Sequence, residues 1–534
     1  MDRKVTRRAF IGLTVAAGGG AVAVGTRALL SAATPAAPSV VPGLAASGSS
    51  AARSSQARRP PASEAALPGD ADWEARNLGA QHEIEGYAGK ASVLPGESFP
   101  LFVSCASRWF TVTAYRVGWY RGDGARRLWR SGSLRGGAQR PSAVTGATST
   151  VTTDWDPVTE VPTDGWPAGS YLLRLDADSG AQRYVPVTVR SQQAADRVVM
   201  KNCVQTWQAY NQWGGYDLYM GPSGAYDDRS LAVSMDRPYD DNGANMFLTY
   251  ERNAIKLAEY LSATAGLPLA YLTSMDIAED AGALRGAAAL ISMGHDEYWT
   301  PGERANVTAA RNAGVNVAFL GANAVFRRTR LSSTAVGGSR LVTCYKTSPD
   351  PAAAANPALA TTNFADQPRP DPESSLTGTS YEGYPVDASY VVTSPSSWVF
   401  AGTGVTAGSS FPHLVGVEYD RVNPGNPVPR PIEVLSHSPL KLDGAASYGD
   451  SAYYTCKSGA GVFNSGTMRW VEAIYGDQPH GIGGATPSMV RQVTTNVLRA
   501  FADGPAAARY PARDNLQATH EYAGDPVGSP GNLQ

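Results

Sequence analysis

Residues 287–299 read AAALISMGHDEYW, and this stretch decides the fold. Its first seven residues are apolar or small and carry no charge, which is typical of a strand buried on both faces of a parallel sheet. Gly294 ends the run, and five polar or aromatic side chains follow it without a spacer. Open α/β sheets bind their ligands beyond the carboxyl ends of the strands. The stretch therefore predicts a buried strand followed by a functional loop.

A helix is predicted directly after this loop. Thr300 and Glu303 form a capping box, with Pro301 at the first helical position. The helix is expected to end at Gly314, and residues 315–320 (VNVAFL) read as the next strand. This β-loop-α-β unit predicts an α/β domain with a mostly parallel sheet.

The chain is too long for one hydrophobic core, because it has 534 residues. Changes in composition along the chain predict five parts. These are a twin-arginine signal peptide at 1–33, a disordered Ala/Ser/Pro-rich linker at 34–70, an immunoglobulin-like β-sandwich at 71–192, an α/β domain at 193–505 with an irregular insertion at about 327–459, and a loose C-terminal tail at 506–534. The sandwich is inferred from short alternating strands between Gly, Pro and Asp turns.

The N-terminus predicts export. Arg7 and Arg8 form the twin-arginine pair, and the apolar stretch 12–24 follows them. This stretch is rich in glycine and is followed by Arg27, so it makes a poor permanent membrane span. Cleavage near Ala32 or Ala33 is expected, and retention as an anchor is the alternative. We therefore expect a protein of the extracellular space or cell envelope. A net charge of −2 without a dense Lys/Arg patch argues against a nucleic-acid partner; a monomer and a homo-oligomer both remain open.

Four cysteines are widely spaced and form no CxxC pair: Cys105, Cys203, Cys344 and Cys456. This spacing excludes zinc-knuckle and thioredoxin sites. An oxidising compartment allows up to two disulfides, with Cys344–Cys456 the preferred pair. Buried free thiols are the equally weighted alternative.

Four sequence elements carry a resemblance to a known family. They are WQAYN at 207–211, GHDEYW at 294–299, AGVN at 313–316 with FLGAN at 319–323, and GVFN at 461–464. With the predicted sandwich they cover most of residues 75–505, and together they resemble the N,N-dimethylformamidase large (beta) subunit and its actinobacterial relatives. The core of that family is similar to the flavodoxin-like sheet of glutamine amidotransferases. Amidotransferases need a cysteine at the strand–helix elbow, and this loop has none.

The resemblance implies a hydrolase of amide C–N bonds that acts on a small amide, and the twin-arginine pattern would make it an exported one. It further implies a mononuclear iron (Fe³⁺) held by two tyrosines and one glutamate. Glu297 is then the carboxylate ligand and Tyr210 the first tyrosine. The second is Tyr216 or Tyr219 in the same loop, with Tyr171 of the sandwich more remote.

The implied chemistry also gives roles to other residues. A hard trivalent cation suits oxygen ligands, and a phenolate at neutral pH requires strong local positive charge. His295 could move protons, and Asn211 and Asn323 could orient the amide. Alternatively, Glu297 caps the following helix or pairs with Arg304.

Two other functions compete with the metal-dependent hydrolase. The aromatic residues at 206–219 could be a platform on a carbohydrate-binding or non-catalytic envelope protein. A metal-free hydrolase would use Glu297 and His295 as an acid/base pair. Asp296 is expected to face solvent or act as a cap.

Overall fold

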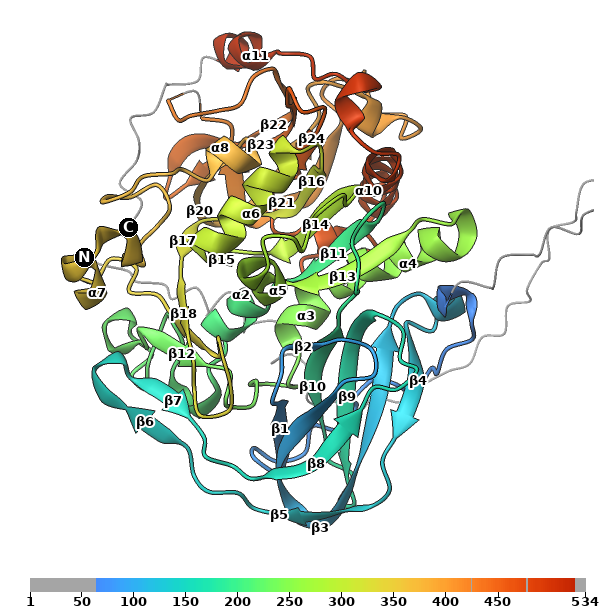
Figure 1. Cartoon of the computed structure of the whole chain (residues 1–534). Coiled ribbons are helices and arrows are strands. Elements are labelled where there is room, and N and C mark those ends of the chain that lie inside the picture. Colours follow the sequence, from blue (N-terminus) through green and yellow to red (C-terminus); the bar gives the residue numbers. More distant parts are fainter. Residues whose placement is uncertain (1–63, 424, 477–478, 524–534) are drawn as a thin grey trace, which may run out of the picture.

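The computed structural model describes residues 64–423, 425–476 and 479–523 (Figure 1). The predicted signal peptide and the predicted linker up to residue 63 lie outside these residues. Of the remaining linker, Glu64–Ala66 forms a helical turn. The Glu64 carboxylate accepts hydrogen bonds from Tyr120 Oη at 3.0 Å and from Arg126 Nη1 at 2.6 Å. The expectation of a disordered linker is therefore wrong for this last part, because its acidic side chain pairs with the neighbouring strands.

The N-terminal region is β-structure, which lies at the bottom of Figure 1. An eight-stranded sheet has the order β1-β3-β9-β10-β2, and β4, β5 and β8 also pair with β3. Its strands are β1 (Ile84–Ala88), β2 (Ser92–Val93), β3 (Ser98–Val117), β4 (Ala125–Arg130), β5 (Leu134–Gly137), β8 (Pro157–Pro162), β9 (Gly169–Ala177) and β10 (Gln182–Val189), and a separate pair comprises β6 (Ala143–Thr145) and β7 (Thr150–Thr152). The long strand β3 pairs with β1, β4, β5, β8 and β9 and so connects most of this sheet.

A seven-stranded sheet forms the centre of the molecule. Its order is β13-β11-β14-β16-β24-β23-β22, with the first five strands parallel and the last two antiparallel. The strands are β11 (Val198–Asn202), β13 (Leu269–Thr273), β14 (Ala289–His295), β16 (Asn316–Ala322), β22 (Ile432–Leu442), β23 (Ala445–Thr455) and β24 (Gly461–Asn464). Strand β14 is the predicted central strand, and all its residues are buried.

Helices cover both faces of this sheet, which explains the uncharged run in β14. Ala289, Ile291 and Met293 belong to one apolar cluster, with side chains of α4 and α10, whereas Leu290 belongs to a second, with side chains of α5 and α6. Successive side chains of a strand point to opposite faces, so both sets must be apolar. The helices are α2 (Val204–Ala209), α3 (Asn245–Tyr250), α4 (Arg252–Ala265), α5 (Ser274–Glu279), α6 (Pro301–Asn312), α7 (Pro351–Ala355), α8 (Ser374–Thr377), α9 (Trp470–Ala473), α10 (Thr486–Ala502) and α11 (Leu516–Ala523).

The region predicted as an irregular insertion contains long strands, and this is a correction. Its strands are β17 (Arg327–Arg328), β18 (Arg330–Ser332), β19 (Leu341–Thr343), β20 (Ser380–Val391) and β21 (Ser410–Arg421), together with β22 and β23. β17 pairs with β15 (Tyr298–Trp299), and β18 and β19 form a sheet with β12 (Ala232–Ser234). Since β23 pairs with β24, the sequence between β16 and β24 extends the central sheet. Pro, Ser and Gly residues lie inside these strands as well as between them, for example Pro385, Pro412 and Pro439.

The C-terminal tail is also packed as far as the structure describes it. Asn515 donates from Nδ2 to Val434 O at 3.0 Å, and Val434 N donates to Asn515 Oδ1 at 2.7 Å. Tyr453 Oη donates to Tyr510 O at 2.8 Å. The expectation of a loose tail is wrong for these residues, because side-chain hydrogen bonds attach them to β22 and β23.

A buried ion pair joins the N-terminal sheet to the α/β region. Arg116 on β3 contacts Glu259 on α4, with 2.6 Å between Nη2 and Oε1, and both side chains are buried. The Glu259 carboxylate also accepts a hydrogen bond from Tyr271 Oη. This pair attaches the two regions to each other.

All four cysteines lie in the described part of the chain and are free. The preferred Cys344–Cys456 disulfide is therefore wrong, and the alternative of free thiols holds. Cys344 is buried, with its Sγ near the backbone carbonyls of Arg328 and Thr361. Among the residues described, no helix is both long and apolar enough to cross a membrane.

Candidate active site

The site begins where β14 ends. Gly294 has a φ of +55°, and a Cβ atom there would lie 2.2 Å from the backbone oxygen of Tyr250. Only glycine is free of strain in this conformation at such close approach. The turn directs residues 295–297 across the carboxyl edge of the parallel sheet, next to the end of β16. This is the location that the sequence predicts for the functional loop.

Two tyrosines and Glu297 converge at this edge. Tyr210 Oη lies 2.6 Å from Glu297 Oε2, and Tyr219 Oη lies 2.7 Å from both carboxylate oxygens. The two phenol oxygens are 3.0 Å apart. Tyr210 directly follows α2 as its C-cap residue, and Tyr219 lies nine residues later in the following loop. The fractional exposures of Glu297, Tyr210 and Tyr219 are only 0, 5 and 7%, so these oxygens form a cluster shielded from solvent.

Tyr298 and Arg327 enlarge the cluster, and neither was a predicted site residue. Tyr298 Oη donates to Tyr219 Oη at 2.7 Å, and Arg327 Nε donates to Glu297 Oε1 at 3.2 Å. Burial, together with the charge of Glu297, raises the pKa of Tyr298 well above its ordinary value. Tyr298 could have been inferred from its place in the quoted stretch. Arg327 comes after β16, and its place beyond the carboxyl end of that strand is the only sequence signal that could have suggested a role in the site.

Lys346 is a second cation of the site, and it lies over the ring of Tyr219. Lys346 Nζ is 3.2 Å from the centre of the Tyr219 ring and donates to Leu218 O at 2.5 Å. Ammonium groups over a ring face are attracted by its electron density. Lys346 and Arg327 together offset negative charge on the buried oxygens.

His295 lies between two carboxylates. Its Nε2 is 3.6 Å from Glu297 Oε2, and its Nδ1 is 3.8 Å from Glu418 Oε2. The ring packs against Tyr210, with 4.9 Å between ring centres, and against Tyr250 at 5.6 Å. Both ring nitrogens are buried and, within the described residues, neither has a partner at hydrogen-bond distance. The imidazole can therefore exchange protons on either side after a small movement.

Asn323 lies on the Glu418 side of this histidine. It adopts a φ of +58° just after β16, and its Nδ2 donates to Glu418 Oε2 at 2.8 Å. Its backbone N–H donates to Asp420 Oδ1 at 2.7 Å, and burial raises the pKa of Asp420 to about 6. The predicted residue Asn323 thus holds Glu418 in place. Glu418, on β21, was missed because its strand lies in the supposed insertion.

Two predicted site residues are not in the cluster. Asn211 donates to Pro238 O at 2.9 Å and accepts from Trp213 N at 3.1 Å, so its amide serves the local backbone. Tyr216 packs at the edge of a separate aromatic cluster that contains Trp155 and Trp213. The turn at 213–215 directs Tyr216 away from Glu297, whereas Tyr219 returns to it.

Several other expectations about this loop are also corrected. Thr300 Oγ1 accepts from Glu303 N and caps α6, and Arg304 pairs with Asp371, so Glu297 does neither. Asp296 is buried rather than facing solvent, because its carboxylate pairs with Lys201 at 2.5 Å.

The aromatic loop is not an exposed platform. Trp207 and Trp213 are buried, and each indole N–H donates at 2.7 Å to a glutamate, Glu251 and Glu85 respectively. Buried tryptophans whose N–H groups are paired support a loop from within. Carbohydrate stacking on these two rings would require the loop to open.

Metal binding at this site would depend on phenol oxygens. Within the described residues, no group of three or more His, Cys, Asp and Glu side chains is arranged to hold a metal ion. The Tyr210–Tyr219–Glu297 cluster is not such a group, because two of its three donors are tyrosines.

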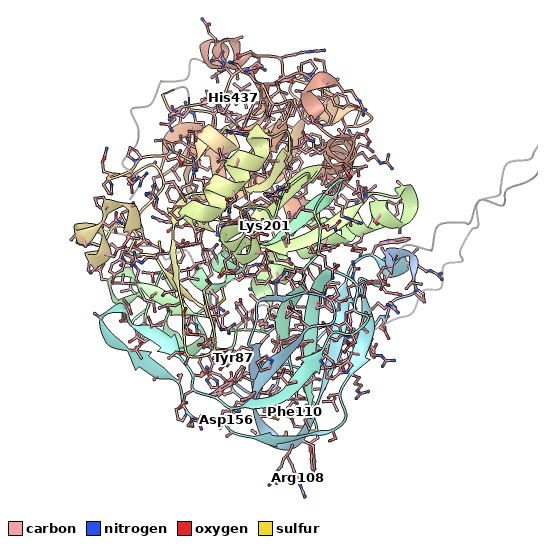
Figure 2. All side chains as sticks on the ribbon, in the orientation of Figure 1. Tyr87, Arg108, Phe110, Asp156, Lys201 and His437 are labelled. Carbon is pink, nitrogen blue, oxygen red and sulfur yellow. The ribbon has the colours of Figure 1, made fainter. Side chains whose placement is uncertain are left out.

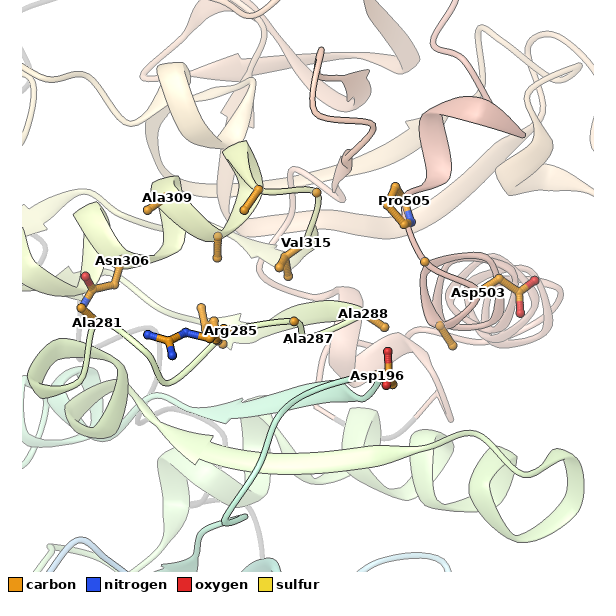
Figure 3. A pocket seen from close by; sticks show the side chains of 17 residues that line it. Asp196, Ala281, Arg285, Ala287, Ala288, Asn306, Ala309, Val315, Asp503 and Pro505 are labelled. Carbon is orange, nitrogen blue, oxygen red and sulfur yellow. The ribbon is translucent and has the colours of Figure 1, made fainter.

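A cavity of about 510 Å³ lies at the other end of the sheet (Figure 3). Ala288 and Val315, which precede β14 and β16, line it together with Arg285, Asn306 and Asp503. Because it opens at the amino ends of the parallel strands, it is separate from the cluster around Glu297.

Comparison with known proteins identifies the family. No curated protein sequence matches the chain. A solved structure of a Paenibacillus sp. cycloisomaltooligosaccharide glucanotransferase complexed with cycloisomaltoheptaose is 12% identical over 24% of this chain and 17% of that chain, with a TM-score of 0.14, which carries no argument about fold or function. The family described as N,N-dimethylformamidase beta subunit-like, C-terminal, matches residues 111–481, which include every residue of the cluster. The chain therefore belongs to the N,N-dimethylformamidase beta subunit-like family.

Proposed function

We propose that the protein hydrolyses the C–N bond of a small amide at the Tyr210–Tyr219–Glu297 cluster, and that this cluster holds one iron ion. The observation that carries the proposal is the convergence of two phenol oxygens and one carboxylate within 3.0 Å of one another, in a buried cluster. The family's dimethylformamidase-like character supports the same reaction class.

The donor set fits such an ion. The two phenol oxygens and the carboxylate lie 2.6–3.0 Å from one another, so the three side chains face one point and could act as a set of ligands. Phenolate and carboxylate oxygens are hard donors that suit a hard cation. Tyr210, Tyr219 and Glu297 would hold the ion, and their three negative charges would match Fe³⁺.

When bound, the ion supplies Lewis acidity, which lowers the pKa of a bound water and polarises an amide carbonyl. His295 would transfer protons: Nε2, on the Glu297 side, would take a proton from the attacking water, while Nδ1 faces Glu418. Asn323 fixes the Glu418 carboxylate for this exchange. The same imidazole can return a proton to the departing amine.

Burial restricts the substrate to small molecules. The most exposed member of the cluster is Tyr219, at 7%. A polymer or large side chain could not reach Glu297 without the surrounding loops opening. A small amide is therefore the partner that the site favours.

The proposal extends to the fold class. Numbered along the chain, the five parallel strands follow the order 2-1-3-4-5, which is the flavodoxin-like order. The switch point of that order lies between β11 and β14, beside the cluster. We further propose that the N-terminal region is an immunoglobulin-like sandwich and that residues 1–33 direct export to the extracellular space or cell envelope through the twin-arginine route.

The test is metal content and amide hydrolysis of the purified protein. We expect near-stoichiometric iron and release of amine from small amides such as N,N-dimethylformamide, with both lost in Glu297→Gln and Tyr210→Phe. Tyr216→Phe is the matched control and should keep both. Iron-free protein that still hydrolyses amides after exhaustive chelation would overturn the metal site and favour a metal-free His295–Glu297 pair. If iron-loaded protein hydrolyses none of the small amides tested, the proposal that the protein is an amide hydrolase is wrong.

A further inference from the structure

Lys201 is a fully buried cation beneath the active-site loop. It lies on β11, and Figure 2 labels it near the centre of the molecule. Its Nζ is 2.5 Å from Asp296 Oδ2 and 2.7 Å from Glu303 Oε1. It also lies 3.6 Å from the centre of the Trp299 ring. One ammonium group therefore contacts three side chains of the segment that carries Glu297.

Stability alone is a weak reason for such a cluster. Removing two or three charges from water costs several kcal/mol per ion, and well-packed apolar residues often replace buried ion pairs without loss. Fixing one arrangement of the chain is a better documented role of buried polar groups than adding stability. The partners of Lys201 indicate which arrangement is selected.

Through Asp296, the lysine orients Glu297. Asp296 also accepts a hydrogen bond from Ser292 Oγ at 2.6 Å, and Ser292 pairs with Lys201 in the parallel register of β11 and β14. Neighbouring side chains of an extended segment point to opposite sides. With Asp296 held on the lysine side, Glu297 is directed to the tyrosines.

Through Glu303, the lysine reaches the other site segments. Gln205 Nε2 donates to Glu303 Oε2 at 2.8 Å, and Gln205 lies on α2, which leads into Tyr210. Thr329 Oγ1 donates to Gln205 Oε1 at 2.8 Å, two residues after Arg327. One continuous buried network thus connects the three segments that supply Glu297, Tyr210 and Arg327.

We propose that Lys201 is a positioning residue that fixes these three segments relative to one another. The expected effect of Lys201 on catalysis rests on the proposed function. Its expected effect on how the three segments are held together does not. Lys201 does not touch the reacting groups and acts only through Asp296, Glu303 and Gln205.

The direct test is hydrogen exchange of the full-length protein carrying Lys201→Met. We expect exchange at least about tenfold faster in peptides covering residues 294–299, 205–212 and 326–330 together. Arg116→Met is the matched control, because it breaks an equally buried pair outside this network. It should leave exchange in these three peptides unchanged. Unchanged exchange in folded Lys201→Met would overturn the proposal, whether or not the protein is an amidase.

A milder variant covers the case in which Lys201→Met does not fold. Thr329→Val removes one hydroxyl and keeps the side-chain shape, so exchange should rise at 326–330 and 205–212 and not at 294–299. No rise in the first two peptides would contradict the network. If hydrolysis is established, Lys201→Met should lower kcat at least about tenfold with KM within about twofold, because positioning acts in the transition state. A change in KM alone would contradict a positioning role.

Discussion

Replacing Tyr219 by phenylalanine removes one oxygen atom from the candidate active site and leaves the ring in place. That oxygen lies 2.7 Å from both Glu297 carboxylate oxygens and 2.7 Å from Tyr298 Oη. In Tyr219→Phe, the buried Tyr298 hydroxyl loses this acceptor, which costs about 1–3 kcal/mol. Glu297 loses a hydrogen bond to a charged group, worth about 1.5–3 kcal/mol. The two costs together predict a loss of roughly 3–5 kcal/mol in the free energy of unfolding.

Urea unfolding at neutral pH in the presence of a chelator measures this loss without a contribution from bound metal. Tyr216→Phe is the control, since it lies three residues away in the same loop and outside the cluster. Its effect should stay within about 0.5 kcal/mol. Iron content, measured on the same preparations without chelator, should fall in Tyr219→Phe and not in Tyr216→Phe. A Tyr219→Phe variant as stable as the wild type would refute the buried oxygen cluster.

Three further predictions concern proton transfer at the site, one buried glutamate and the four cysteines. His295→Asn and Glu418→Gln should each lower kcat about 10²–10⁴-fold with iron content retained, because they remove proton transfer and leave the oxygen ligands in place; unchanged kcat in both would contradict that role. Glu373 is 3% exposed, and burial raises its pKa to about 7 from the ordinary 4.5, so the folded state binds its proton more tightly than the unfolded state does. Its contribution to stability is therefore present below about pH 4.5 and falls by on the order of 3 kcal/mol as the pH rises through 7. Glu373→Gln should remove this loss, so thermal unfolding at pH 8 should show a variant more stable than the wild type, and equal stability would contradict the assignment. Alkylation of unreduced, denatured protein should modify all four cysteines, and fewer than four modified thiols would mean that a disulfide forms.

Local chemistry made part of this site predictable. The strand and the capped helix after it are observed where residues 287–313 predict them, although the strand continues through Gly294 and ends at His295. These features depend on contacts between near neighbours: backbone hydrogen bonds, capping side chains and the alternation that buries both faces of β14. Glu297 and His295 follow at the sheet edge for the same reason.

The long-range partners were not predictable in this way. The choice between Tyr216 and Tyr219 depends on a turn whose direction is set by packing against Trp213, and no spacing rule separates the two. Glu418 was missed because proline and glycine inside the strands themselves, such as Pro412 and Gly416 in its own strand β21, made residues 380–455 look like loops. Asp296 was misplaced because its partner, Lys201, lies almost a hundred residues earlier.

By itself, the sequence determined the α/β unit, the edge at which the site lies and the carboxylate at its centre. Only the tertiary structure decided which tyrosines meet that carboxylate, which cations offset its charge and which buried lysine holds the loop. Periodicity and capping depend on residues that are close together in the chain, so they can be read from the sequence. Convergence of side chains depends on how segments about ten to two hundred residues apart pack together, so it exists only in the folded molecule.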